Sequence, residues 1–349
     1  MSTSLIEGSG TTGTVSAVGR LTHQFFRSRE TGILAALIVV IVVTTIVNPT
    51  FLFSPDGFRD LLLTPSILIL IAVGQAMVII TRSVDLSVGS VVGLTAYLAG
   101  RLFIDIPGIP IIVVFLITIA GGAMLGLVNG LLVAYGKVPA LVITLGTLYA
   151  YRGINVLWTG SDRINSSDLP KAFLNLGTQT LFFIPTLTII AVVVVLAAGW
   201  YLRNKRGGRE LYAIGSDPDA AELYGLKVTR RILVAFVLSG ALAGLAGILF
   251  AARYGTTNSQ TGTGLELQAV GAAVIGGVAI FGGSGTVYGA AIGAVLLLTI
   301  NRALPTLGIQ DFWQQAVVGA LIIGAIVLDR VLSLRLSRTL ISERQVSHD

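Results

Sequence analysis

The sequence predicts an all-α protein that crosses a membrane about ten times. The 349-residue chain is 54% hydrophobic and only 11% charged, whereas soluble domains carry roughly 25% charged residues. Several apolar stretches reach the roughly 20 residues that a helix needs to cross a bilayer. These stretches are too long for the alternating strands of about 10 residues that build a membrane barrel.

Ten spans can be drawn along the chain, and two of them, 138–158 and 265–281, are weak because they carry many glycine, threonine and polar residues. The predicted spans are 32–48, 61–81, 86–104, 110–135, 138–158, 181–202, 231–252, 265–281, 286–303 and 312–329. They form one transmembrane domain over 31–330, between a polar N-terminal tail (1–30) and a polar C-terminal tail (331–349). No small-residue cleavage site follows the first apolar run, so we expect a retained span rather than a signal peptide.

The basic residues predict the orientation. With a cytoplasmic N-terminus, 16 of the 23 Lys and Arg residues fall on the cytoplasmic side and 6 outside, while Arg152 lies within a span. Cytoplasmic loops carry an excess of Lys and Arg, so both termini are predicted to be cytoplasmic. The same rule accounts for the net charge of +6. We therefore expect contact with a lipid bilayer and not with nucleic acid.

The residues that are missing exclude several chemistries. The chain has no cysteine, and its two histidines, His23 and His348, sit in the polar tails, so thiol chemistry and a histidine metal site are excluded. The stretch from Gly130 to Lys137 resembles a nucleotide-binding loop, but it has five residues between its glycines instead of four, and Val138 replaces the required Ser or Thr. We expect no ATPase site, no bound metal or cofactor and no catalytic constellation.

Two glycine patterns suggest an internal repeat. Gly89, Val91 and Gly93 match Gly285, Val287 and Gly289 at a fixed offset of 196, and each set lies where one span ends and the next begins. Transporters are often built from such halves, with the site at their junction. Glycine-rich membrane sequence also produces chance matches, which is the alternative.

A charged pair interrupts the apolar sequence at "ITRSVDLSVGS" (80–90). Arg82 and Asp85 either form a short turn among the headgroups or break a helix that lines an aqueous path, because irregular backbone at membrane depth must face protein or water. Asp85 suits the N-cap of the following helix, with Ser87 on its first turn. Arg82 would offset the charge of the carboxylate. The alternative role for Asp85 is direct contact with a substrate.

A polar stripe follows within the span at 138–158. Thr144, Thr147, Tyr151 and Asn155 recur every three or four residues and so share one helical face. Such a face either holds helices together or lines a hydrophilic path. With Asn129 and the Arg82–Asp85 break, they are the candidate pathway residues: Arg82, Asp85, Ser87, Asn129, Thr144, Thr147, Tyr151 and Asn155.

The polar loop 203–230 contains a short helix signal over about 218–224. Asp217 suits the N-cap, Pro218 the first helical position, Asp219 the positive end of the dipole and Gly225 the C-terminal stop. This helix would present Leu223 and Tyr224, which suits docking to a partner, although an ordinary amphipathic connector is the alternative. The candidate coupling residues are Asp217, Pro218, Asp219, Glu222, Leu223, Tyr224 and Gly225.

Near the predicted outer face, Gln260 and Glu266 are candidates for contact with an external partner. Glu266 could instead cap a helix or pair with Arg253.

Four stretches together resemble the permease subunits of bacterial ABC importers for ribose-type sugars. They are "VDLSVGS" (84–90), "NGLLVAYGKVPALVITLGTLYAYRGI" (129–154), "AIGSDPDAAELYGLKV" (213–228) and "GGVAIFGGSGTVYGAAIGA" (276–294). Sugar permeases commonly have two glycines where Arg82 and Ser83 stand here. "ITRSVDLSVGS", "LYAYRGINVLWTG" and "NSQTGTGLELQAV" look most like the branch that imports autoinducer-2 and like its rhamnose-transporting relatives.

The resemblance implies the other parts of an importer. A cytoplasmic ABC ATPase carrying ATP and Mg would dock on the helix around 218–224, and an extracytoplasmic sugar-binding protein would deliver the cargo. A second permease chain, identical or a sister subunit, would complete the membrane part in the bacterial inner membrane. The fold would be of the vitamin B12-importer (type II) kind. The rival hypothesis from the residues is an ion-coupled secondary carrier, which usually keeps ionisable residues in mid-span.

Overall fold

The computed structural model describes residues 29–136 and 138–310, with a few further positions between 313 and 327. Within that part, eight helical segments are long and apolar enough to cross a membrane, which confirms the predicted all-α, multi-span fold. They are α2 (Arg29–Val47), α4 with α5 (Pro55–Leu63 and Pro65–Ile80), α6 (Val88–Asp105), α7 (Ile111–Gly136), α8 (Ala140–Thr159), α10 (Thr186–Asn204), α13 (Val228–Tyr254) and α15 (Val287–Thr306). The predicted tails lie almost entirely outside the described residues, and the predicted span at 312–329 is described only in part.

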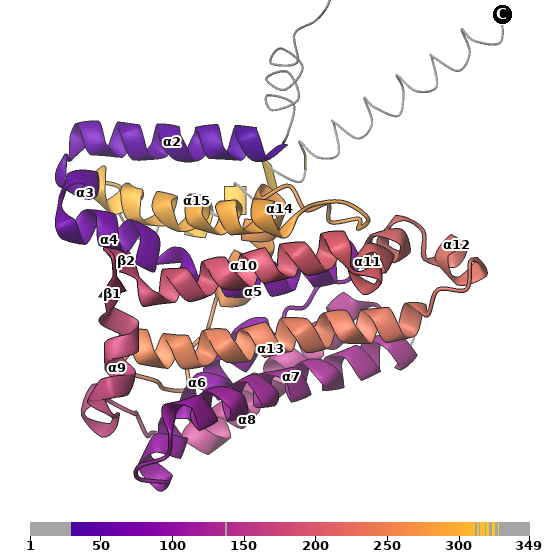
Figure 1. Ribbon diagram of the computed structural model, residues 1–349, viewed down its shortest axis with the longest axis horizontal. Coiled ribbons are helices and arrows are strands. Elements are labelled where there is room, and N and C mark those ends of the chain that lie inside the picture. The colour runs from indigo at the N-terminus through magenta and orange to yellow at the C-terminus, as the bar shows by residue number, and fades with distance from the viewer. Residues whose placement is uncertain are drawn as a thin grey trace, which may run out of the picture.

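Shorter elements gather at the two ends of the bundle (Figure 1). One end carries α9 (Lys171–Thr178) and a small antiparallel hairpin of β1 (Thr180–Leu181) and β2 (Ile184–Pro185), and we call it the hairpin end. The other carries α11 (Arg206–Ser216) and α12 (Pro218–Leu223), and we call it the α12 end. The remaining short elements are α3 (Thr50–Phe53), the 3-10 turn η1 (Ser166–Asp168) and α14 (Leu265–Ile275).

The span predicted at 265–281 is a half-length helix. α14 has 11 residues, which is about 16 Å of helix against a hydrocarbon core about 30 Å thick. It lies between Gly264 and Gly277, which both adopt left-handed backbone (φ +85° and +83°) that only glycine reaches without strain. The span at 138–158, which looked equally weak, is by contrast the continuous helix α8.

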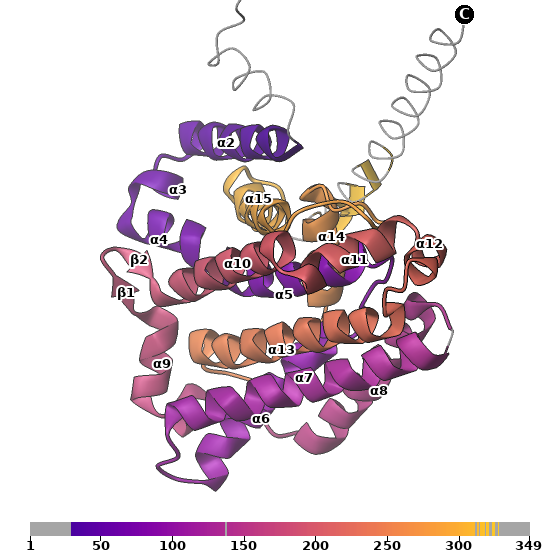
Figure 2. The ribbon, with the colours of Figure 1, turned by 45° about the vertical axis from the view of Figure 1, so that its right-hand side comes forward.

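The centre of the bundle is α5, whose sixteen residues are all buried. It contacts α13, α15, α14 and α10, and Figures 1 and 2 show it enclosed between α13 and α15 with α10 alongside. This position explains why α5 is apolar on every face. The surrounding helices expose large apolar side chains, such as Val39, Leu116 and Leu196, as lipid-facing helices do.

The closest helix crossing joins α7 to α13 through glycines. A Cβ added at Gly126 would press on the Phe236 carbonyl oxygen and on Gly240 Cα of α13, and one at Gly122 on Gly244. Glycines four residues apart on both helices thus let the backbones touch, as at other membrane crossings that use small residues.

We expect Gly126→Val to destabilise the protein by about 2–3 kcal/mol, because a side chain here overpacks backbone that cannot move aside. The exposed Gly146 on α8 has no heavy atom near its Cβ position, so Gly146→Val is the matched control. Thermal unfolding in detergent measures both. Equal melting temperatures for the two variants would contradict the close crossing.

The helix boundaries favour the internal repeat over a chance match. Shifting α5 and α6 by the offset of 196 gives 261–276 and 284–301, and the structure has α14 at 265–275 and α15 at 287–306. An irregular segment separates the two helices of each pair. The segment 276–286 lies against the end of α5 and the start of the segment 81–87. Gly283 N donates to the Ile80 carbonyl at 3.0 Å, and Gly282 packs against Arg82.

Candidate functional site

The predicted break in the apolar sequence is an irregular segment at 81–87, between α5 and α6. Asp85 is 1% exposed, and its Oδ1 accepts hydrogen bonds from Ser87 N (2.9 Å) and Ser87 Oγ (2.7 Å). Such local bonding competes with helical hydrogen bonding, which explains why the chain stops being helical here. The N-cap position itself is Ser87 and not Asp85 as predicted. Asp85 nevertheless satisfies the Ser87 N–H just before the helix.

Asp85 begins a buried chain of polar side chains that crosses from α6 to α8. Asn129 Nδ2 of α7 donates to Ser87 Oγ at 2.6 Å and lies 3.5 Å from Asp85 Oδ1. Asn129 Oδ1 in turn lies 3.2 Å from the Tyr151 hydroxyl of α8. We call Asp85, Ser87, Asn129 and Tyr151 the polar network. All four are at most 5% exposed, so their polar groups need partners within the protein. The Tyr151 hydroxyl also donates to the Leu125 carbonyl of α7 at 3.0 Å.

Gln75, in the otherwise apolar α5, fixes the backbone of the break. In the amide orientation that satisfies both partners, Gln75 donates to the Asp85 carbonyl and accepts from the Asp85 N–H, both at 3.1 Å. Gln75 is not among the site residues that the sequence predicts. The sequence did contain a signal for it. Gln75 is the one amide in α5, and Ser66 is the only other polar side chain among its sixteen residues.

The rest of the polar stripe on α8 also bonds within the chain. Thr144 Oγ1 donates to the Val84 carbonyl (3.0 Å), Thr147 Oγ1 to the Thr144 carbonyl (3.3 Å), and Asn155 Nδ2 to the Ser259 carbonyl (3.2 Å). Of the two expected roles for this face, helix packing is the one seen in this conformation. A path along this face of α8 would require the hydrogen bonds of Thr144 and Asn155 to break.

We expect Asn129→Ala to lower the free energy of unfolding by about 1–2 kcal/mol. The buried Ser87 Oγ loses its donor, although Ser87 still bonds to Asp85 and the Tyr151 hydroxyl still donates to the Leu125 carbonyl. The matched control is Asn175→Ala, an exposed asparagine on α9, which should change stability by less than about 0.5 kcal/mol. Thermal unfolding of both variants in detergent tests this. A wild-type melting temperature for Asn129→Ala would show that the network contributes nothing.

Arg82 points away from Asp85 and toward the α12 end, which differs from the expectation that it offsets the carboxylate. Its Nε donates to the Gly215 carbonyl at 2.7 Å, and its Nη2 donates to the Ser216 carbonyl. Both carbonyls belong to the last turn of α11, next to α12. Arg82 adopts a left-handed backbone (φ +62°), a conformation that costs free energy for a residue with a side chain and that directs its guanidinium to α11.

Two further contacts tie α11 to the irregular segments. The Tyr212 hydroxyl donates to the Gly285 carbonyl at 3.0 Å. Gly215 lies so close to the Ile80 carbonyl that a Cβ there would overlap it. The end of α5, the segment 276–286 and the end of α11 therefore form one packed cluster next to the break at 81–87.

The short helix in the polar loop forms as predicted. α12 runs from Pro218 to Leu223, and the Asp217 side chain accepts from the N–H groups of Asp219 and Ala220, both at 3.1 Å. Gly225 adopts the left-handed conformation (φ +78°) that ends it. Leu223 and Tyr224 are 90% and 88% exposed, and α12 projects beyond the ends of α10 and α13 (Figure 1).

The residues expected at the outer face lie in different places. Gln260 is exposed on the loop after α13. Glu266 is half-buried in the first turn of α14, where its Oε1 accepts from Gly264 N (3.1 Å) and its Oε2 lies against Gly89 in the first turn of α6. The capping alternative therefore describes Glu266. Arg253, its other predicted partner, donates to Thr64 Oγ1 at 3.0 Å.

A bundle of apolar spans, a buried polar network at a helix break and a projecting helix linked to that break define a polytopic membrane permease. Residues 57–326 match the family described as branched-chain amino acid transport system / permease component. The chain belongs to that family.

Its curated relatives include the autoinducer 2 import system permease proteins LsrC of three bacteria. The chain is 37% identical to that of Enterobacter sp. (strain 638) over 312 residues, covering 89% of this chain and 90% of the relative. It is also 37% identical to those of Klebsiella pneumoniae (89% of each chain) and Salmonella typhimurium (90% of this chain and 89% of the relative). No solved structure matches the chain.

Proposed function

We propose that this chain is the membrane-spanning subunit of an ATP-binding-cassette importer that carries a sugar or sugar-like furanose of the autoinducer-2, rhamnose or ribose class. The observation that carries the proposal is α12, which presents two almost fully exposed apolar side chains between two spans. Apolar residues exposed on a stiff polar projection mark a surface that a partner covers. The names of the relatives support the cargo class.

In this proposal a cytoplasmic ATPase, which binds ATP and Mg, docks on α12 and drives the transport cycle. Its movement displaces α11, and Arg82 transmits the displacement from the Gly215 and Ser216 carbonyls to the break at 81–87. The polar network then opens, and Asp85, Ser87, Asn129 and Tyr151 exchange their mutual hydrogen bonds for bonds to the hydroxyl groups of the cargo. Thr144, Thr147 and Asn155 extend the same polar face along α8.

The proposed orientation places both termini and the α12 end in the cytoplasm of a bacterium, with the chain in the inner membrane. A sugar-binding protein docks at the hairpin end, and Gln260, exposed on the loop after α13, is the candidate contact. Glu266 is poorly placed for that contact because it packs against Gly89. A second permease chain, identical or a sister subunit, completes the pathway.

The test is uptake into liposomes. Permease is reconstituted with and without its ATPase and binding protein, and autoinducer-2 uptake is measured with ATP inside or outside the vesicles. We expect uptake only with all components and with ATP on the ATPase side. Uptake by the permease alone, driven by a proton or sodium gradient, would instead support the ion-coupled carrier.

A further inference from the structure

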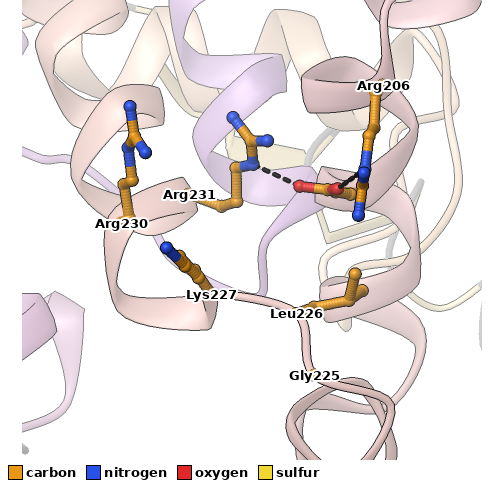
Figure 3. A pocket seen from close by; sticks show the side chains of 7 residues that line it. Arg206, Gly225, Leu226, Lys227, Arg230 and Arg231 are labelled. Atoms are coloured by element: carbon orange, nitrogen blue, oxygen red, sulfur yellow. Dashed lines mark hydrogen bonds and ion pairs between the residues drawn. The ribbon is translucent and has the colours of Figure 1, made fainter.

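A pocket of about 250 Å³ lies at the α12 end, where α11, the connection after α12 and the start of α13 meet. Figure 3 shows the side chains of Arg206, Lys227, Arg230 and Arg231 around it. Its lining is completed by Glu210, Gly225 and Leu226. Four cations from two helices and a loop thus surround one concave site, and neither the transport pathway nor the exposed tip of α12 uses it.

The pocket keeps a positive charge after its internal ion pairs are counted. Glu210 accepts from Arg206 Nε at 2.7 Å and from Arg231 Nε. The hydrogen bond from Arg231 lowers the pKa of Glu210, with a further contribution from Arg206, although burial opposes the shift. Glu210 is therefore ionised at neutral pH and neutralises one cation of the four. Among the described residues, Lys227 and Arg230 form no ion pair.

The helix dipole adds to this positive charge. Lys227 is the N-cap of α13, and Arg230 and Arg231 lie in its first turn. The N-terminal end of a helix carries partial positive charge and favours anions, so cations there are disfavoured. Such an arrangement is stabilised when an anion binds among the cations, and Glu210 supplies only one negative charge.

The position of the pocket indicates where that anion comes from. α13 has 27 residues and is about 40 Å long, so its ends extend past a hydrocarbon core of about 30 Å into the headgroups. Trp200, near the end of α10, is 54% exposed, and Lys205 Nζ lies 4.6 Å from the centre of its ring. Exposed tryptophan of this kind marks the membrane interface, and Arg206 follows six residues later.

We propose that this pocket binds the phosphate of an anionic phospholipid headgroup from the adjoining leaflet. Basic pockets between the ends of membrane helices are suited to such headgroups. Arg231 is held in place by Glu210 and shapes the site, while Lys227 and Arg230 supply the free charge. A lipid in the pocket would fix the start of α13 against α11. Lipid binding at this pocket requires neither the cargo nor the ATPase.

The experiment measures lipid selectivity of the full-length permease in nanodiscs. Binding of phosphatidylglycerol relative to phosphatidylcholine is determined by native mass spectrometry. The wild type should retain phosphatidylglycerol, and Lys227→Gln and Arg230→Gln should each weaken that preference about fivefold, or about 30-fold together. The matched control, Arg203→Gln with Arg209→Gln, removes the same charge from exposed arginines at the same end that do not line the pocket.

Retention of the preference by the control and its loss by the pocket variant would support the proposal. Equal loss in both, or no preference in the wild type, would overturn it, and if the double variant fails to fold the two single variants decide. Displacement of the lipid by millimolar inorganic phosphate would assign the site to a soluble anion instead. A defect of the pocket variant, but not of the control, in ATPase assembly in phosphatidylcholine nanodiscs would assign it to an acidic protein surface.

Discussion

Replacing both Leu223 and Tyr224 with aspartate should lower ATP-driven uptake at least about 100-fold while the permease still folds and reaches the membrane. Burying a large apolar side chain contributes about 1.5–3 kcal/mol, so two such contacts account for a factor of about 100 or more in affinity for the ATPase. Both residues are about nine-tenths exposed in the isolated chain. Their replacement should therefore change the free energy of unfolding by less than about 0.5 kcal/mol.

Uptake, stimulation of ATPase activity by the permease and co-purification of the ATPase measure this effect together. Leu223→Met with Tyr224→Phe keeps the apolar surface and is the matched control, which should transport normally. Glu222→Arg, or deletion of 218–224, should also abolish coupling. Normal uptake by the double aspartate variant, with the ATPase still required, would show that α12 is not where the two proteins meet.

The second large effect is expected at Arg82, where substitution should separate ATP hydrolysis from transport. Arg82 makes two hydrogen bonds from a charged group to carbonyls of α11, and such bonds contribute about 1.5–3 kcal/mol each. Arg82→Gln should therefore lower the number of cargo molecules imported per ATP hydrolysed at least about tenfold. The rate of ATP hydrolysis should stay within about twofold of the wild-type rate. Arg82→Lys should be intermediate, because an ammonium cannot reproduce the planar two-point contact.

The matched control is Arg101→Gln. Arg101 pairs with Asp105 at the other end of α6, and both side chains are substantially exposed, so the pair contributes at most about 1 kcal/mol. Import per ATP should be unchanged in this variant. If Arg82→Gln instead raised the KM for cargo with an unchanged import per ATP, Arg82 would belong to the cargo site and not to the link.

Local signals in the sequence predicted the elements that are formed by neighbouring residues. Asp217, Pro218 and Gly225 define α12 because a cap, a fixed φ and a left-handed stop act within one or two turns. The long apolar runs gave the spans because bilayer thickness sets their length. The length of α14 was overestimated because apolar residues continue past Ile275, whereas the helix ends there and the backbone turns at Gly277.

The sequence by itself determined a polytopic helical membrane protein, a polar break after α5 and a short capped helix between two spans. Only the tertiary structure decided that Arg82 turns to α11, that Asn129 joins Ser87 to Tyr151, and that Glu266 lies against Gly89. Those partners are separated by 22 to 177 positions along the chain. Helical periodicity shows on which face of a helix a side chain lies. Which residues that face contacts depends on how α5, α7, α11 and α14 pack together.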